Sequence, residues 1–299
     1  MAEMTPTVQN VTIPEKTEKV SSPWRDAMRI LFRNKFAITG MVIILFFIII
    51  AVLAPVITHY QYDAGELVNR NKAPSAEHVF GTDYNGRDML TRIVYGARIS
   101  LWVGTFSVLG SIVAGTLLGL VAGYYGRWAD QLISRIFDIM LAFPSILLAI
   151  AIVSILGPSL QNALLAIAII NVPTFGRLVR SRVLSLKEEE FITAARAMGM
   201  KDSRILLRHI LPNSLAPVIV TGTMSVATAI IEAAALGFLG LGAQAPEPEW
   251  GKMLADSREY IQKAPWTVIF PGLSIMLTVL GFNLIGDGLR DALDPRMKN

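Results

Sequence analysis

The stretch Phe36–Ile57 reads FAITGMVIILFFIIIAVLAPVI and contains no charged residue. It is long enough to cross a bilayer, because a helix needs about 20 apolar residues to span the hydrocarbon core. Four further uncharged stretches meet the same requirement: Ile99–Tyr125, Ile139–Gly176, Ile210–Ile231 and Ala264–Gly286. The sequence therefore predicts an all-α integral membrane protein.

The third stretch, Ile139–Gly176, is nearly twice the length that one crossing needs. Its middle carries the sequence GPSLQN at Gly157–Asn162, which is typical of a turn. Dividing the stretch there gives six transmembrane helices. They form one six-helix domain over residues 36–299, and membrane lipid is its main surrounding solvent.

Composition excludes several other classes of protein. Of the 299 residues, 53% are hydrophobic and 17% are charged, and there is no cysteine. Disulfides, thiolate catalysis and cysteine-ligated metals are therefore excluded. His59, His78 and His209 show no ligand spacing, so we expect no metal site. The net charge of +4 comes from basic residues beside the apolar stretches, which indicates membrane topology and not nucleic-acid binding.

The distribution of lysine and arginine predicts the orientation of the chain. Cytoplasmic loops of membrane proteins carry the excess of these residues. With the N-terminus inside, 19 of the 27 would be cytoplasmic and 8 would be outside. We therefore expect both termini in the cytoplasm.

The residues before the first span divide into two parts. Residues 1–23 are polar and interrupted by prolines, so we expect a disordered cytoplasmic tail. In residues 24–35, apolar side chains gather on one helical face and arginines on another. This pattern predicts an interfacial helix on the inner membrane surface.

The inner loop 187–212, between the fourth and fifth spans, is the most informative segment. A helix is expected over Lys187–Met198, with a narrow apolar stripe made by Phe191, Ala194, Ala195 and Met198. Gly199 would end this helix in the left-handed conformation.

A second short helix is expected after that turn. Asp202 would cap it, and it would run through Leu211 to Pro212, where the fifth span starts. From the pattern alone, this helical hairpin either packs on its own subunit or presents its small residues to a partner.

The same loop resembles the conserved "EAA" loop of ABC-importer permeases. The resemblance lies in Thr193-Ala194-Ala195, then Gly199, then Ile210-Leu211-Pro212, with matching spacing throughout. The chain departs from that pattern in having Thr193 in place of glutamate and His209 in place of the first isoleucine. The resemblance implies a coupling helix that sits in a groove of a cytoplasmic ATPase subunit.

Other motifs narrow the resemblance to the C-type subunit of the dipeptide, oligopeptide and nickel importer permeases. They are Gly81–Asp88 with Tyr95–Leu101, Ala235–Gly242 with Pro248–Gly251, and Gly286–Pro295. The resemblance implies a type I ABC importer permease fold in a bacterial cytoplasmic membrane.

It also implies partners: a homologous second permease, two ATPase subunits and an extracytoplasmic substrate-binding protein. A peptide would be the substrate, with a nickel chelate as the alternative. ATP and magnesium would bind to the partner ATPases, and no cofactor is expected in this chain.

Two smaller sets of residues are candidates for function. In the outer loop 59–98, the residues Asp83, Tyr84, Arg87 and Asp88 favour turns, so they either shape the loop or contact the binding protein. Glu232 is an acid within an apolar stretch. Such a group usually faces the bundle interior or a water-filled path, so Glu232 would line the translocation path, contact the second permease or lie near the outer surface.

Motifs for catalysis are missing from the sequence. It has no phosphate-binding loop of the form G-x4-G-K-[ST], no nucleophile elbow and no metal-ligand motif. A non-catalytic subunit is therefore expected, with energy supplied by a partner. An ion-coupled secondary transporter would need several midplane charges or broken helices, and a membrane enzyme or channel would need a polar cluster or pore ring.

Overall fold

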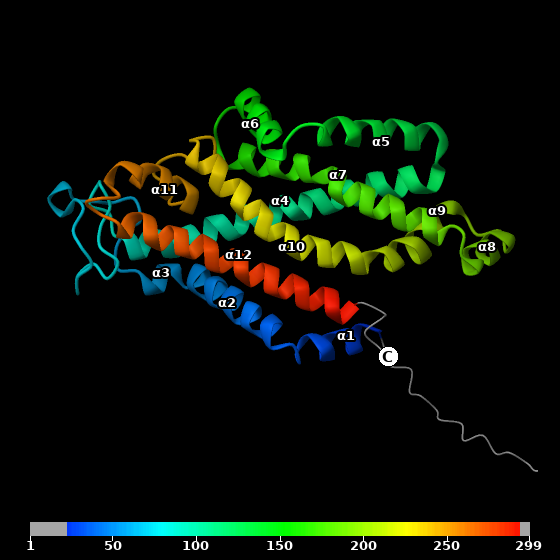
Figure 1. Ribbon diagram of the computed structural model, residues 1–299, viewed down its shortest axis with the longest axis horizontal. Coiled ribbons are helices and arrows are strands. Elements are labelled where there is room, and N and C mark those ends of the chain that lie inside the picture. Colours follow the sequence, from blue (N-terminus) through cyan, green and yellow to red (C-terminus); the bar gives the residue numbers. More distant parts are fainter. Residues whose placement is uncertain (1–22, 294–299) are drawn as a thin grey trace, which may run out of the picture.

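The structure, a computed structural model, describes residues 23–293 (Figure 1). The tail expected at residues 1–23 lies outside this range, apart from Pro23. Within the range, the helices are α1 (Pro23–Leu31), α2 (Lys35–Val52), α3 (Ala54–Ile57), α4 (Met89–Tyr125), α5 (Arg127–Leu141), α6 (Ser145–Leu156), α7 (Leu160–Leu186), α8 (Glu190–Ala197), α9 (Asp202–Ile205), α10 (Leu211–Phe238), α11 (Trp250–Ser257) and α12 (Trp266–Leu293). Short 3-10 turns lie at Leu67–Asn69 and Arg258–Tyr260, and a π-helical turn lies at Leu206–Ile210.

Five of these helices are long and apolar enough to cross a membrane: α2, α4, α7, α10 and α12, the fourth counted from Asp202. The helices α5 and α6 meet the same criteria only as a pair and are bent by 95°, so the chain has six crossings if this pair is one broken span and five if it is a re-entrant loop. The part of the apolar stretch before Gly157, counted as one of the six predicted spans, is thus divided between two helices. Pro144 explains the break, because it lacks an N–H donor and disfavours helical geometry at Phe143.

The division of the long apolar stretch at Gly157–Asn162 is confirmed. Gly157 ends α6 with a φ of +93°, a conformation that glycine adopts without strain. Ser159 then caps α7, because its hydroxyl oxygen accepts a hydrogen bond from the N–H of Asn162 at 3.1 Å.

The start of α4 and the end of α1 differ from the predicted boundaries. The helix α4 begins at Met89, so the last part of the expected outer loop 59–98 is helical. The helix expected over 24–35 ends at Leu31, because Asn34 starts a new helix. The Asn34 side chain accepts hydrogen bonds from the N–H groups of Phe36 and Ala37 at 3.0 and 3.3 Å.

The helices α4 and α7 run in the same direction and form the centre of the core. Small residues on α4 let the two backbones approach closely, as is common in membrane bundles. A methyl group on Gly119 would lie only 2.5 Å from the carbonyl oxygen of Gly176. About two helical turns before Gly119, the Ser111 hydroxyl donates a hydrogen bond to the carbonyl of Ala168 at 2.8 Å.

The helices α2, α10 and α12 form a second layer against α4 and α7 (Figure 1). At one end of the bundle lie α1, α8 and the last turn of α12, and at the other end lie α3, α11 and the segment 58–88 (Figure 1). The bundle thus has two different ends, and the candidate functional residues lie at both.

Candidate functional site

The helix α8 is packed against its own subunit along one face. Ile192 and Ala195 on this face are 0% and 2% exposed, and they join the main apolar core. Phe191, Ala194 and Met198 lie on the exposed side. The predicted apolar stripe was therefore wrong in one member, because Ala195 points inward.

The turn after α8 has the predicted left-handed glycine. Gly199 has a φ of +75° and its N–H donates to the carbonyl of Arg196 at 2.9 Å. A separate second short helix was expected after this turn, but the structure does not have one. From α9 the chain continues through the π-helical turn directly into α10, with Pro212 in the first turn of α10, where a missing N–H is best tolerated.

Asp202 does not cap a helix with its side chain, contrary to the prediction. Its carboxylate accepts a hydrogen bond from the Tyr124 hydroxyl at 2.5 Å. The Arg196 guanidinium lies over the Tyr124 ring, and the Lys187 ammonium donates to the Tyr124 carbonyl at 3.1 Å. These contacts fix the loop to the end of α4, and sequence reasoning missed Tyr124 because it lies far from the loop in the chain.

Three large apolar side chains are exposed among the charged residues of the loop surface. Phe191, Met198 and Leu207 are 43%, 76% and 64% exposed. Thr193 and Pro212 are also exposed, and Leu211 is half-buried. His209 lies near Phe191, with ring centroids 6.3 Å apart, and its Nε2 atom is buried with no hydrogen-bond partner among the residues described.

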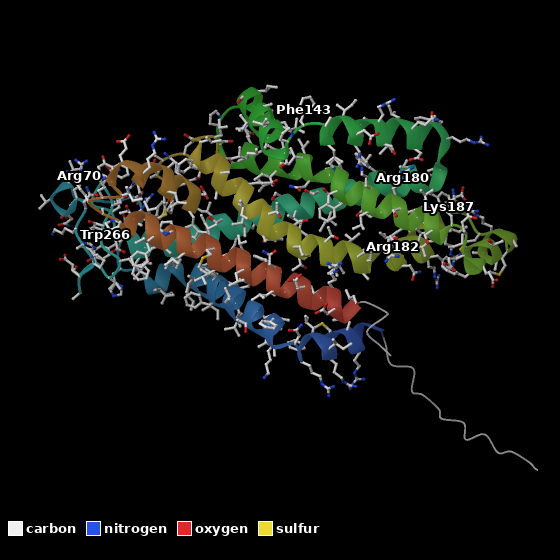
Figure 2. The ribbon with its side chains drawn as sticks, in the orientation of Figure 1. Arg70, Phe143, Arg180, Arg182, Lys187 and Trp266 are labelled. Carbon is white, nitrogen blue, oxygen red and sulfur yellow. The ribbon has the colours of Figure 1, made fainter. Side chains whose placement is uncertain are left out.

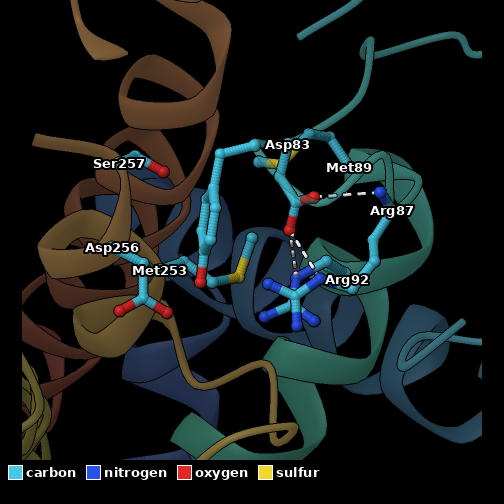
Figure 3. Close-up of a pocket in the computed structure, with 8 residues that line it drawn as sticks. Asp83, Arg87, Met89, Arg92, Met253, Asp256 and Ser257 are labelled. Carbon is cyan, nitrogen blue, oxygen red and sulfur yellow. Dashed lines mark hydrogen bonds and ion pairs between the residues drawn. The ribbon is translucent and has the colours of Figure 1, made fainter. Parts of the chain in front are cut away.

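The outer-loop residues at the opposite end form a buried ion cluster (Figure 3). The Asp83 carboxylate accepts hydrogen bonds from the Arg87 Nε at 2.7 Å and from the Arg87 backbone N–H at 2.9 Å. The Arg92 Nε lies 3.6 Å from the same carboxylate. All three side chains are buried. This cluster holds the loop against α4, so Asp83 and Arg87 have little surface left for a partner.

Asp88 is also buried and has a structural role of its own. It caps α4 by accepting hydrogen bonds from the N–H and hydroxyl groups of Thr91, both at 2.8 Å. Its other oxygen lies 3.0 Å from the His78 Nδ1. Of the four candidate docking residues, Tyr84 alone is partly exposed, and its ring stacks on Tyr260 at 5.5 Å.

Glu232 lies in the second half of α10 and is 8% exposed. One carboxylate oxygen accepts a hydrogen bond from the Asn171 side-chain amide of α7 at 3.1 Å. An ionisable side chain in a spanning helix is costly unless it has such polar partners. The contact joins α10 to α7, and the role of Glu232 in the translocation path stays a prediction.

A second buried acid, Glu249, was missed in the sequence because it lies in a connection between spans. Its carboxylate caps α11 by accepting from the N–H groups of Gly251 and Lys252, both at 2.8 Å. Burial raises the pKa of Glu249 to about 7, although the two backbone donors act in the opposite direction. Gly237 of α10 leaves room for this carboxylate, because a methyl group there would lie 2.2 Å from it.

Among residues 23–293, no group of three or more histidine, aspartate or glutamate side chains is arranged to hold a metal ion. The site residues thus form three separate features: an apolar loop surface at one end, a buried ion cluster at the other, and a buried acid between them. Figure 2 shows that side chains project from the bundle along its whole length and at both ends.

Comparison with known proteins assigns the chain to a family. The family described as binding-protein-dependent transport system inner membrane component matches residues 115–299. The N-terminal transmembrane domain of oligopeptide transport permease C matches residues 22–74. The chain therefore belongs to the family of inner-membrane permease components of binding-protein-dependent (ABC) transport systems, and it is a multi-pass membrane protein.

Individual relatives are similar over nearly the whole chain. The dipeptide transport system permease protein of Alkalihalophilus pseudofirmus is 70% identical over 96% of this chain and 94% of its own length. The glutathione transport system permease protein of Pectobacterium atrosepticum is 48% identical over 96% of both chains.

A solved structure supports the fold. A chain of the MetNI methionine ABC transporter, in an inward-facing conformation, superposes with a TM-score of 0.54 at 23% identity. The match covers 68% of this chain and 97% of that chain. The expected ABC importer permease fold is thereby confirmed.

Proposed function

We propose that this chain is a pore-forming subunit of an ATP-driven importer that carries di- and oligopeptides across the cytoplasmic membrane. The observation that carries this proposal is the 70% identity to a dipeptide transport permease over nearly the full length. The relatives named for glutathione, which is itself a peptide, agree with it. They favour a peptide over the alternative of a nickel chelate.

The apolar end of the loop 187–212 is the proposed contact for a cytoplasmic ATPase. Phe191, Met198 and Leu207 expose apolar surface at the end of the bundle where α8 lies. Exposed apolar side chains rimmed by polar ones are typical of protein interfaces. Ile192, Ala195 and Tyr124 fix the inner face of the same segment to the bundle. A displacement of the loop by the ATPase would therefore also move α4 and α10.

This assignment implies which end of the bundle faces the cytoplasm and where the other partners would bind. The loop end, together with both ends of the described chain, would face the cytoplasm, as the 19 to 8 distribution of basic residues predicts. The binding protein would meet the opposite end, where Tyr84 and its exposed neighbours lie. A second permease would complete the path, and ATP with magnesium would bind to two ATPase subunits.

A transport assay tests the proposal directly. The chain would be co-expressed with a second permease, ATPase subunits and a binding protein from the same organism, purified as a complex and reconstituted into proteoliposomes. We expect ATP-dependent accumulation of a labelled dipeptide that requires the binding protein. Accumulation of a nickel chelate without any peptide uptake would overturn the peptide assignment.

A further inference from the structure

A groove of about 630 Å³ lies between the ends of α7, α10 and α12, on the side of the bundle where α1 and α8 lie. Pockets of this size accept small organic ligands. Its lining combines one arginine of α7, one arginine and one leucine of α12, and polar and apolar residues of α10: Arg182, Arg290, Leu293, Asn213, Ala216, Pro217, Val220, Thr221 and Met224. Figure 2 labels Arg182 beside this end of α10.

The two arginines give the groove a positive character. Within residues 23–293, neither Arg182 nor Arg290 forms an ion pair, whereas Arg177 and Arg180 on the same helix pair with Asp138 and Asp130. The described lining of the groove includes no carboxylate. A guanidinium presents several N–H donors in a plane and matches a carboxylate in a bidentate arrangement.

The groove also offers a second kind of polar group. Pro217 has no N–H, so the carbonyl of Asn213, one turn earlier in α10, has no helical donor. The Thr221 hydroxyl lies one turn further along the same helix. The groove thus contains donors suited to a carboxylate and an acceptor suited to an amide N–H, and a peptide with an acidic side chain carries both groups.

The polarity of α10 separates this groove from the lipid-facing surface. The exposed residues of α2 are predominantly aliphatic or aromatic, as expected against hydrocarbon. One accessible side of α10 carries hydroxyl groups as well, at Thr221, Ser225 and Thr228. Polar side chains along a spanning helix are typical of a water-filled path.

We propose that Arg182 and Arg290 receive the side-chain carboxylate of an acidic peptide in the cytoplasmic half of the translocation path. This inference rests on the proposed peptide import and adds the residues that attract the substrate. Their charge lowers the free energy of the anionic group as it leaves the outer half of the path. Peptides with an additional carboxylate should therefore depend most strongly on the two arginines.

The test uses the complete complex in proteoliposomes with saturating binding protein. Uptake of Ala-Asp and Ala-Lys is measured for wild type, Arg182→Gln, Arg290→Gln and the double variant. A hydrogen bond to a charged group is worth enough that its loss should lower Ala-Asp uptake about tenfold in the double variant. Ala-Lys uptake should change less than about twofold, because its second charge opposes the attraction.

Matched variants separate charge from fold. Arg182→Lys and Arg290→Lys should retain most of the Ala-Asp uptake, because they keep the charge. Arg29→Gln, an equal charge change on the exposed side of α1, should alter the uptake of neither peptide. Equal losses for both peptides, or no loss for either, would overturn the proposal.

An anionic lipid headgroup is the other chemical occupant of such a groove, and one further arm distinguishes it. The uptake measurements are repeated in vesicles made of zwitterionic lipid alone. If the effect of the substitutions disappears there, the arginines bind lipid and the proposal is wrong. A wild-type complex that imports neither peptide would instead overturn the proposed function itself, and this inference with it.

Discussion

Shortening Met198 to alanine should weaken docking of the ATPase without weakening the fold. The side chain is 76% exposed at the tip of the loop 187–212, so it contributes little to the packing of its own subunit. Complete burial of a methionine side chain stabilises by about 1.5–3 kcal/mol. Removing the exposed part of the Met198 side chain should therefore weaken the free energy of ATPase binding by about 1–2 kcal/mol. That corresponds to a dissociation constant roughly five to thirty times higher.

The measurement is a binding titration of labelled ATPase subunits against the permease pair in nanodiscs, with the melting temperature recorded for each variant. Lys201→Ala, an exposed change in the same turn, is the matched control and should leave the dissociation constant unchanged.

Ala195→Trp provides the opposite control. Ala195 is 2% exposed, so a large ring there should lower the melting temperature by overpacking the core. An unchanged dissociation constant for Met198→Ala would show that the exposed apolar surface is not the ATPase contact. A lowered melting temperature for the same variant would place the side chain in the fold.

Three further predictions concern other parts of the chain. Glu232→Gln should preserve assembly, because a glutamine oxygen can still accept from Asn171, but should change peptide uptake severalfold; wild-type uptake for several peptides would remove Glu232 from the path. In this cysteine-free chain, a cysteine at Ser75 should react with an impermeant thiol reagent from outside, and one at Ser203 only after permeabilisation; the reverse result would invert the topology. Glu249 has a pKa raised from 4.5 to about 7, so the folded protein binds its proton more tightly than the unfolded chain does; its contribution to stability should be full below pH 4.5 and be lost as the pH rises to about 7. Glu249→Gln should flatten that part of the melting-temperature profile, and an unchanged profile would contradict the assignment.

Part of the fold followed from the sequence because the relevant signal is local. An uncharged stretch such as Phe36–Ile57 is a helix in a bilayer whatever surrounds it, since every backbone group must be bonded within the segment. The same holds for the break at Gly157 and for the left-handed turn at Gly199, where glycine is the residue that the backbone conformation requires. Residue order alone was sufficient at these places.

The candidate sites were predicted less completely, because burial depends on contacts between distant segments. The sequence assigned Ala195 to an outward stripe, whereas the main core occupies that side of α8. Asp83 and Arg87 were candidates for docking, yet they bond to each other and lie beside Arg92. A charged residue has the same appearance in a sequence whether it is solvated or buried with a partner.

The sequence by itself determined the class of the protein, five of the crossings and the position of the loop 187–212, because hydropathy and turn chemistry act over a few residues. Only the tertiary structure decided the 95° bend between α5 and α6, the anchoring of Asp202 by Tyr124, and the meeting of Arg182 with Arg290 in one groove. Each of these depends on which helices pack together. Such packing is set by close approach at residues such as Gly119 and Gly176, whose partners are far away in the chain.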